Sequence, residues 1–148
     1  MQIVIQRVTN AKVSVDSLGF DASINDGLCV FLGIEKGDDH SHAKWIAKKI
    51  AHLRIFKDCD EKMNLSVQDI QGEILLISQF TLAGDCSKGN RPSFIRAEDP
   101  EIAEPLVELV GKIVQEEHNV PVKKGIFGAM MKITMTNDGP VTLIVKRD

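Results

Sequence analysis

The chain has 148 residues and a mass of 16.3 kDa, which fits one domain with a single core and requires no disulfide or structural metal. Hydrophobic residues make up 43% and charged residues 26%, which argues against disorder, collagen and coiled coil. No apolar run reaches the roughly 18 residues of a membrane span, and the opening MQIVIQRVTNAKVSV reads as a strand, not a signal peptide. The net charge of −3 argues against non-specific coating of DNA.

The three cysteines, Cys29, Cys59 and Cys86, are an odd number at wide spacings without a CxxC pair. We therefore expect no disulfide framework and no structural zinc, and a reducing cytoplasm is the expected location. His40 and His42 form an HxH motif with acidic neighbours. No third ligand lies near them in sequence, so we predict neither a metal site nor another cofactor.

Hydrophobic patterning predicts β-structure in the first quarter of the chain. Residues 2–8 and 11–16 alternate in strand fashion, and Asn10 marks a turn or bulge between them. The continuous apolar run 28–34 predicts a strand buried on both faces. The Asn-Asp-Gly triplet at 25–27 is typical of a hairpin turn.

Two amphipathic helices are predicted. The first follows 37–39, with one of its two aspartates or Ser41 as the N-cap, and carries an apolar stripe over 43–53. The second lies within 100–118 and has an Asp-Pro start that suits the cap and the first helical position. Pro105 is awkward inside a helix, so this helix is expected to kink there or to begin near it.

The remaining segments alternate between strand and loop patterns. The expected strands are 73–82, 129–136 and 141–146, and the expected loops are 58–64, 84–93 and 137–140. Strands and helices do not alternate strictly, which favours a mixed, β-rich α/β fold over a doubly wound sheet. No repeat or linker divides the chain, so residues 1–148 are expected to form a single domain.

Three polar stretches carry the candidate chemistry. In Ser78-Gln79-Phe80-Thr81-Leu82, a polar pair interrupts an apolar strand, and buried hydroxyl and amide groups need partners. A ligand or a second strand could supply them, as could ordinary polarity at a strand end.

The second stretch, residues 87–96, carries Lys88, Arg91 and Arg96 with one aromatic residue and no acid. Such a loop suits contact with phosphate or RNA, although a solvated surface loop would have the same composition.

The third stretch is the turn 137–142, which contains Gly139-Pro140. Composition alone favours a trans bond there, because only about 5–6% of X–Pro bonds are cis. Arg7 shares a strand face with Ile3 and Ile5, so part of its side chain should point toward protein. Carbonyl groups of the turn would be suitable acceptors for its guanidinium, and the alternative is that Arg7 extends to water.

The chain resembles the D-aminoacyl-tRNA deacylase family, formerly called D-tyrosyl-tRNA deacylases, along its whole length. The resemblance rests on IQRVTNAKVSV, GLCVFLGIEKGD, RIF with KMNLSV, SQFTL, GNRPSF and TNDGPVT. SQFTL and TNDGPVT are specific in combination, and they match the main bacterial and eukaryotic branch of the family. The resemblance implies a β-rich α/β fold of its own type, with sheets or a barrel and two to three helices.

The resemblance also implies a homodimer with active sites at the subunit interface and no cofactor. The implied reaction is hydrolysis of the ester that joins a D-amino acid, or glycine, to the 3′-terminal adenosine of tRNA. The residues that would form one side of the pocket are Ser78, Gln79, Phe80 and Thr81. Gly139-Pro140, in the cis form, would reach in from the other subunit, and Arg7 would hold that turn.

The residues leave the mechanism open between two alternatives. Thr81 could act as a nucleophile, but its hydroxyl needs activation, and the sequence offers no partner for it. We favour backbone N–H groups near Phe80 and Thr81 as the oxyanion site, with the terminal 2′-hydroxyl assisting water. The rival function is a non-catalytic tRNA- or nucleotide-binding module. It would use the basic loop and a C-terminal cluster, Lys123, Lys124, Lys132, Lys146 and Arg147.

Overall fold

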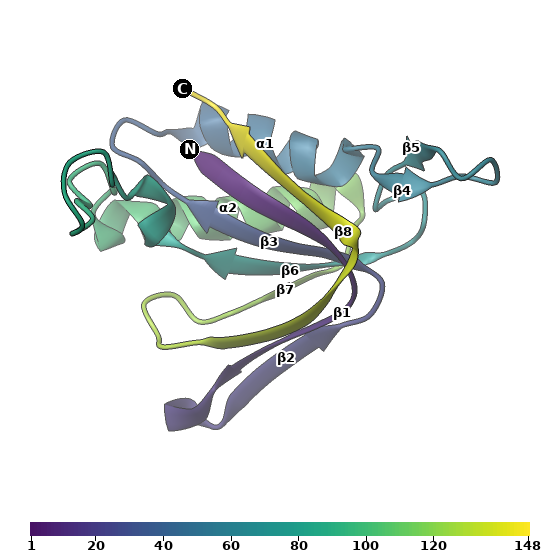
Figure 1. Cartoon of the computed structure of the whole chain (residues 1–148), viewed down its shortest axis with the longest axis horizontal. Coiled ribbons are helices and arrows are strands. Elements are labelled where there is room, and N and C mark those ends of the chain that lie inside the picture. Colours follow the sequence, from purple (N-terminus) through teal and green to yellow (C-terminus); the bar gives the residue numbers. More distant parts are fainter.

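The computed structural model describes residues 1–148. It consists of a curved six-stranded sheet, two α-helices and a small separate hairpin (Figure 1). The elements are β1 (Gln2–Val15), η1 (Asp16–Leu18), β2 (Phe20–Ile24), β3 (Gly27–Gly33), α1 (His40–His52), β4 (Phe56–Lys57), β5 (Met63–Leu65), β6 (Glu73–Ser78), η2 (Phe80–Ala83), α2 (Pro100–His118), β7 (Val122–Lys124) and β8 (Lys132–Lys146). The predicted mixed, β-rich α/β fold with two to three helices is confirmed.

β1 is the strand around which the sheet is built. On one side it pairs with β3 and then with β2, and on the other side β8 runs antiparallel along almost its whole length. The register against β8 shifts on both sides of Val8, and such bulges bend a strand. The irregularity expected at Asn10 is therefore a bulge within one long strand, and the prediction of two separate strands is wrong.

The hairpin predicted at residues 25–27 is also wrong. β2 and β3 both pair with β1 and not with each other. The triplet therefore connects two strands that pair with successive parts of β1. The glycine is needed for a different reason, which is a close approach of two strands. A Cβ at Gly27 would lie 1.9 Å from the carbonyl oxygen of Glu73 at the start of β6.

β3 and β6 pair in parallel in the middle of the sheet. As the apolar run predicted, β3 is buried on both faces: Leu28 and Val30 face one hydrophobic cluster and Cys29 faces another. Burial raises the pKa of the Cys29 thiol to about 12. A thiol that stays protonated in an apolar site packs as a small hydrophobe and is chemically inert.

Each helix begins directly after an aspartate predicted as its N-cap, but only Asp39 caps its helix with its side chain, because Asp99 makes no such hydrogen bond. The Asp39 carboxylate accepts hydrogen bonds from Ser41 and His42, and the His42 ring accepts the Asp39 N–H. The bonds from Ser41 and then His42 hold the pKa of the Asp39 carboxyl well below its usual range. The HxH motif thus contributes to a helix cap.

α2 begins at Pro100, directly after Asp99, and continues through Pro105. The alternative that it begins near Pro105 is wrong. Pro105 lies on the exposed side of the second turn, and Glu101, whose carbonyl loses its helical partner there, is exposed as well. Because that carbonyl can bond to water, the lost hydrogen bond does not end the helix.

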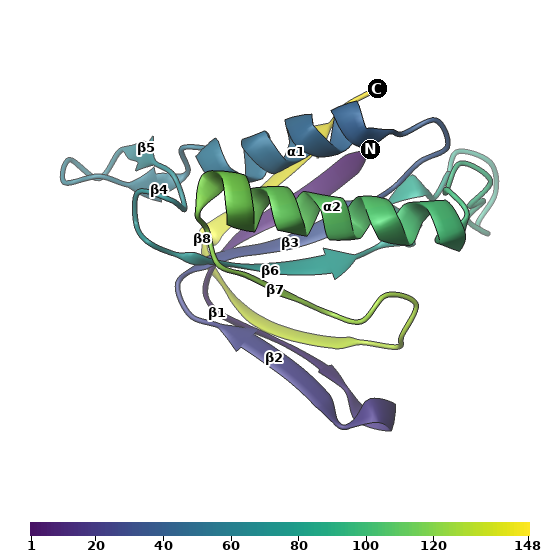
Figure 2. The same cartoon turned by 180° about the vertical axis from the view of Figure 1, so that it is seen from behind.

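The two helices cover one face of the sheet (Figure 2), and their apolar stripes pack against it. The other face of the sheet is curved and packs around a smaller hydrophobic cluster, to which β1, β2, β3 and β6 contribute. Neither helix has the length and apolar character needed to cross a membrane. The buried stripe of α1 consists of Ala43, Ile46, Ala47, Ile50 and Ala51, close to the predicted set.

Four strands differ from the prediction. β4 and β5 form a hairpin, and the loop predicted at 58–64 is shorter than expected because Met63 and Asn64 belong to β5. Asp58 accepts hydrogen bonds there from Asp60, Lys62 and Asn64. β7 was not predicted, because three residues carry little pattern. The predicted strands 129–136 and 141–146 are one continuous strand, β8, that passes through the turn between them.

Candidate functional site

The Ser-Gln-Phe-Thr segment lies where β6 ends. The strand predicted for 73–82 stops at Ser78, and the chain turns into η2. The N–H of Gln79 donates to the carbonyl of Leu32 (2.8 Å) and closes the ladder with β3. Ser78 and Gln79 are half-buried, whereas Phe80 and Thr81 are exposed. The polar pair therefore marks a strand end, and the two residues after it project from the sheet.

The hydroxyl of Thr81 accepts a hydrogen bond from the side-chain amide of Gln79. A carboxamide is not a base at neutral pH, and the hydroxyl has no hydrogen bond to histidine, lysine or carboxylate. An activated nucleophile needs such a neighbour. The side chains of this segment can therefore position a substrate, but they do not activate Thr81.

The backbone of the same segment offers two free donors. Leu82 N–H donates to the Gln79 carbonyl (3.3 Å), and Gly84 N–H donates to the Thr81 carbonyl (3.0 Å). The N–H groups of Phe80 and Thr81 open the turn, and the first N–H groups of any helical turn lack acceptors within it. They are available to a negatively charged oxygen.

Phe80 lies against Phe94, which comes from the end of the basic loop. The two rings meet edge to face with centroids 5.2 Å apart, which is one of the arrangements that aromatic pairs prefer. Phe80 remains 59% exposed. The loop is thus held beside the Ser-Gln-Phe-Thr segment by an aromatic contact at its base.

The Gly139-Pro140 turn forms a bend within β8, and its peptide bond is cis. The trans bond favoured by composition is wrong, and the cis form implied by the family resemblance is present. Asn137 ties the turn across its base: its side-chain oxygen accepts the Val141 N–H (3.0 Å), and its amide nitrogen donates to the Thr142 hydroxyl (3.0 Å). Asn137 was not predicted as a site residue, although it is the second residue of the TNDGPVT motif.

Arg7 supports the turn from beneath. Its side chain is 5% exposed. Its Nε donates to the Asp138 carbonyl (3.2 Å), and its Nη1 donates to the Ile55 carbonyl (2.6 Å). The Asp138 carboxylate lies 3.4 Å from Nε. One guanidinium therefore connects β1, the segment after α1 and the turn of β8.

A groove of about 390 Å³ lies between this turn and the β4–β5 hairpin. Its walls are formed by Arg7, Phe56, Lys57, Met63, Asp138, Gly139, Pro140 and Val141. Phe56 and Met63 were not predicted as site residues. Their signal in the sequence was RIF with KMNLSV, which flanks the loop that separates them.

Within one chain, the turn and the Ser-Gln-Phe-Thr segment lie apart. Arg7 is level with Leu28 and Ile74, whereas Ser78 is level with Leu32, four residues further along the sheet. Four residues span about 13 Å along a strand, and the three strand spacings from β8 to β6 add about 14 Å across. In Figure 1 the bend of β8 and the end of β6 lie at opposite ends of the sheet.

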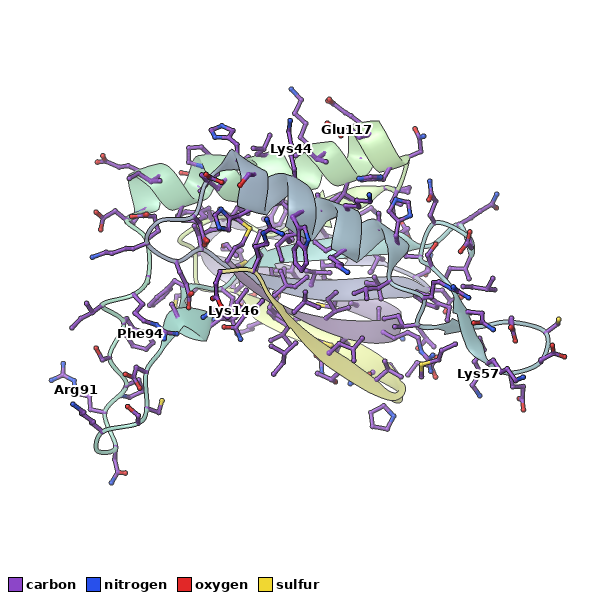
Figure 3. The ribbon with its side chains drawn as sticks, turned by 90° about the horizontal axis from the view of Figure 1, so that it is seen from above. Lys44, Lys57, Arg91, Phe94, Glu117 and Lys146 are labelled. Carbon is purple, nitrogen blue, oxygen red and sulfur yellow. The ribbon has the colours of Figure 1, made fainter.

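The basic residues fall into paired and unpaired groups. Figure 3 shows Arg91 at the tip of its loop, far from the body. Arg96 pairs with Glu35 (3.0 Å) and fixes the loop to the end of β3. In the C-terminal cluster only Arg147 lacks a carboxylate partner; the ion pairs are Lys123–Glu73, Lys124–Glu108, Lys132–Asp16 and Lys146 with Glu35 and Asp148.

The chain is similar over almost its whole length to known D-aminoacyl-tRNA deacylases. Residues 4–146 match the family model described as D-Tyr-tRNA(Tyr) deacylase. The D-aminoacyl-tRNA deacylase of Geotalea daltonii is 54% identical over 147 residues, which is 99% of this chain and 96% of that protein. The D-aminoacyl-tRNA deacylase of Flavobacterium psychrophilum is 50% identical over 98% of this chain and 96% of that protein.

Solved structures show the same fold. One, described as c-Myc DNA Unwinding Element Binding Protein, superposes with a TM-score of 0.93 at 38% identity and covers 100% of this chain and 99% of that chain. Another, of a probable eukaryotic D-amino acid tRNA deacylase, superposes with a TM-score of 0.82 at 16% identity, with 97% of each chain covered. On the family model and the full-length identities, the chain belongs to the D-aminoacyl-tRNA deacylase family of hydrolases.

Proposed function

We propose that the protein hydrolyses the ester bond of D-aminoacyl-tRNA, releases the D-amino acid and tRNA, acts on glycyl-tRNA as well, and rejects L-aminoacyl-tRNA. The observation that carries the proposal is the 54% identity to a D-aminoacyl-tRNA deacylase over 99% of the chain. The two free N–H groups at Phe80 and Thr81 support it, because hydrolysis of an ester needs donors for the oxyanion.

The active site is formed by two chains. The separation of the turn from the Ser-Gln-Phe-Thr segment, about 13 Å along and 14 Å across the sheet, is too large for one aminoacyl group to touch both. Most homo-oligomers are two-fold symmetric dimers. In such a dimer, Gly139-Pro140 of one chain meets the Ser-Gln-Phe-Thr segment of the other, and two equivalent sites result.

The chemistry uses the backbone. A water oxygen attacks the ester carbonyl carbon, and the negative charge that develops on the carbonyl oxygen is bound by the N–H groups of Phe80 and Thr81. The bond to the ribose 3′ oxygen then breaks, and that oxygen takes up the proton that the attacking water loses. The neighbouring 2′-hydroxyl positions the water. An aminoacyl ester is already activated, so this arrangement needs no side-chain base.

Selection between D and L forms follows from the geometry at Cα. The carbonyl groups of Gly139 and Pro140 bind the ammonium group of the substrate, and the donors at Phe80 and Thr81 fix the ester. One direction at Cα then points outward and another points into the turn. A D side chain takes the outward direction, an L side chain would collide with the turn, and glycine has no side chain to exclude.

The basic loop contributes contacts to the tRNA. Lys88 and Arg91 have no ion-pair partner, and Arg91 lies at the loop tip in Figure 3. Arg96 keeps one side of the loop against Glu35, with Arg96 56% exposed. Because one end of the loop is held in place, its cations can approach phosphates near the 3′ end of the tRNA while that end enters the site.

The direct test compares hydrolysis of D-Tyr-tRNA and L-Tyr-tRNA by the purified protein. We expect the D ester to be cleaved and the L ester to decay at its spontaneous rate, with a mass of two chains by sedimentation. A protein that binds both esters equally and cleaves neither would be the non-catalytic module. A single-chain mass with full activity would contradict the shared site.

Thr81→Val tests the backbone mechanism. Valine removes the hydroxyl and keeps the shape and the backbone N–H, so kcat for D-Tyr-tRNA should fall by less than about tenfold, because the oxyanion donors persist. Thr134→Val, an exposed threonine of β8, is the matched control. Loss of turnover in the Thr81 variant alone, with tRNA binding and melting temperature unchanged, would instead assign Thr81 as the nucleophile.

A further inference from the structure

A second groove lies on the outer side of α1 and is separate from every residue discussed above as part of the site. Its volume is about 350 Å³. We call it the α1 groove, and its walls are Trp45, Lys48, Lys49, His52, Leu53 and Arg54. Three of these six residues are permanently charged cations, and none is an acid. The helix itself contains no Asp or Glu.

No carboxylate forms an ion pair with the cations of the α1 groove. Arg54 donates to the backbone and side-chain oxygens of Asn64 (2.9 and 2.8 Å), which are neutral acceptors. Lys48 and Lys49 form no ion pair. Of the 18 lysines and arginines in the chain, seven are ion-paired, and all seven lie outside the groove: Arg7, Lys12, Arg96, Lys123, Lys124, Lys132 and Lys146.

Trp45 holds two cations at the rim of the groove. Lys49 Nζ and the guanidinium carbon of Arg147 each lie 5.2 Å from the centroid of its ring. Cation–π contacts at this distance favour defined positions for flexible side chains. Because the two charges are held beforehand, less conformational entropy is lost when an anion binds.

The helix dipole accounts for only part of this arrangement. Basic residues in the last turn stabilise the negative end of a helix, and Lys49 and His52 lie in that turn. The dipole gives no reason for Arg54 and Arg147, which lie outside the helix. The Asp69 carboxylate already accepts hydrogen bonds from Ser66, and these bonds, more than the charges of His52 and Arg54, hold the pKa of Asp69 below its usual value.

The position of α1 relative to the proposed active site favours a nucleic acid as the partner of the α1 groove. A Cβ at Gly33, which precedes the loop to α1, would lie 2.9 Å from the side chain of Leu82 in η2. α1 therefore begins at the end of the sheet where η2 lies (Figure 1). Its 13 residues extend about 20 Å away from there. A nucleic acid whose 3′ end enters the site can lie along this helix.

We infer that the α1 groove binds phosphates of the tRNA stem, with Lys48, Lys49, Arg54 and Arg147 as the contacting cations and Trp45 as their support. The inference rests on the proposed function for the identity of the RNA, and on the unneutralised charge of the groove for the site itself. Contacts of this kind set the register of the RNA and carry no sequence information.

Binding of uncharged tRNA, followed by fluorescence anisotropy, tests the groove without any catalytic step. In Lys48→Ala/Lys49→Ala we expect Kd to rise about thirtyfold, because each duplex phosphate contact adds about 0.9 to the salt slope, or about fivefold at about 0.15 M salt. The slope of log K against log salt should fall by about 2. The control, Lys12→Ala/Lys112→Ala, removes the same charge from other surfaces and should leave both quantities unchanged.

Hydrolysis separates the groove from the active site. The Lys48/Lys49 variant should cleave a D-aminoacyl ester of adenosine, which has no stem, at the rate of the unmodified protein, while KM for D-aminoacyl-tRNA rises by the factor found for Kd. Equal tRNA binding by the variant and the parent overturns the inference, as does an equal loss in the control. If the unmodified protein cleaves no ester, the proposed function fails, and the anisotropy result still decides on the groove.

Discussion

Arg7→Met is expected to lower the free energy of unfolding by about 3 kcal/mol and to reduce hydrolysis of D-aminoacyl-tRNA by more than a hundredfold. Methionine fills part of the same space but leaves the carbonyls of Ile55 and Asp138 without their donor, and each unsatisfied buried group costs about 1–3 kcal/mol. The turn of β8 then loses its support, and a displacement of about 1 Å at a reacting centre can cost about a hundredfold in rate. Denaturant unfolding and steady-state kinetics measure the two effects.

Lys12→Met is the matched control for Arg7. Lys12 lies on the same strand, its side chain is 52% exposed, and it pairs with Asp21 at the surface. The control makes the same change in net charge, so a general electrostatic effect would appear in both variants. Arg7→Lys keeps the charge without the forked geometry and should recover part of the stability. An Arg7→Met protein that is as stable and as active as the parent would remove Arg7 from the site.

Pro140→Ala is expected to reduce cleavage of D-Tyr-tRNA at least tenfold and to narrow the ratio of D to L cleavage by a similar factor. The pyrrolidine ring fixes φ, so without it the carbonyls of residues 139 and 140 no longer point steadily to one place. The ring also fills the space that an L side chain would need. Rates on both esters, measured at matched enzyme concentration, give the ratio.

Pro121→Ala controls for the loss of a rigid ring elsewhere. Pro121 is exposed and comes directly before β7, far along the chain from the turn. Its replacement should leave the ratio of D to L cleavage unchanged. Unaltered rejection of the L ester by Pro140→Ala, with unaltered cleavage of the D ester, would show that the turn is not the chiral filter.

The sequence predicted the elements that have a simple burial pattern and missed those defined by contacts. The continuous apolar run of β3 and the periodic apolar stripe of α1 are such patterns, and both are present. The hairpin expected at 25–27 failed because glycine has two uses, and here Gly27 admits a close approach of the Glu73 carbonyl. β6 was extended past Ser78 because Phe80 and Leu82 are apolar, although they belong to η2.

The candidate site was predicted from motifs and not from their spatial relation. Local polarity identified the Ser-Gln-Phe-Thr segment and the Gly-Pro turn, and the strand face of Ile3 and Ile5 directed Arg7 toward protein. Asn137 was missed because its bonds to Val141 and Thr142 depend on the bend of β8. Residues 137–140 were predicted as a loop between two separate strands, and a loop does not reveal that bend. Phe56 and Met63 reach the groove only through the hairpin that brings them together.

The shared position of β3 and β6 between two hydrophobic clusters has a consequence for unfolding. Alternate side chains of β6 belong to different clusters, Ile74 and Leu76 to the helix side and Leu75 and Ile77 to the other. Neither cluster can be opened without exposing a face of the same strands, so we infer a single cooperative transition for the whole chain. η2 continues directly from β6, and the two donors it presents therefore keep their geometry until that transition.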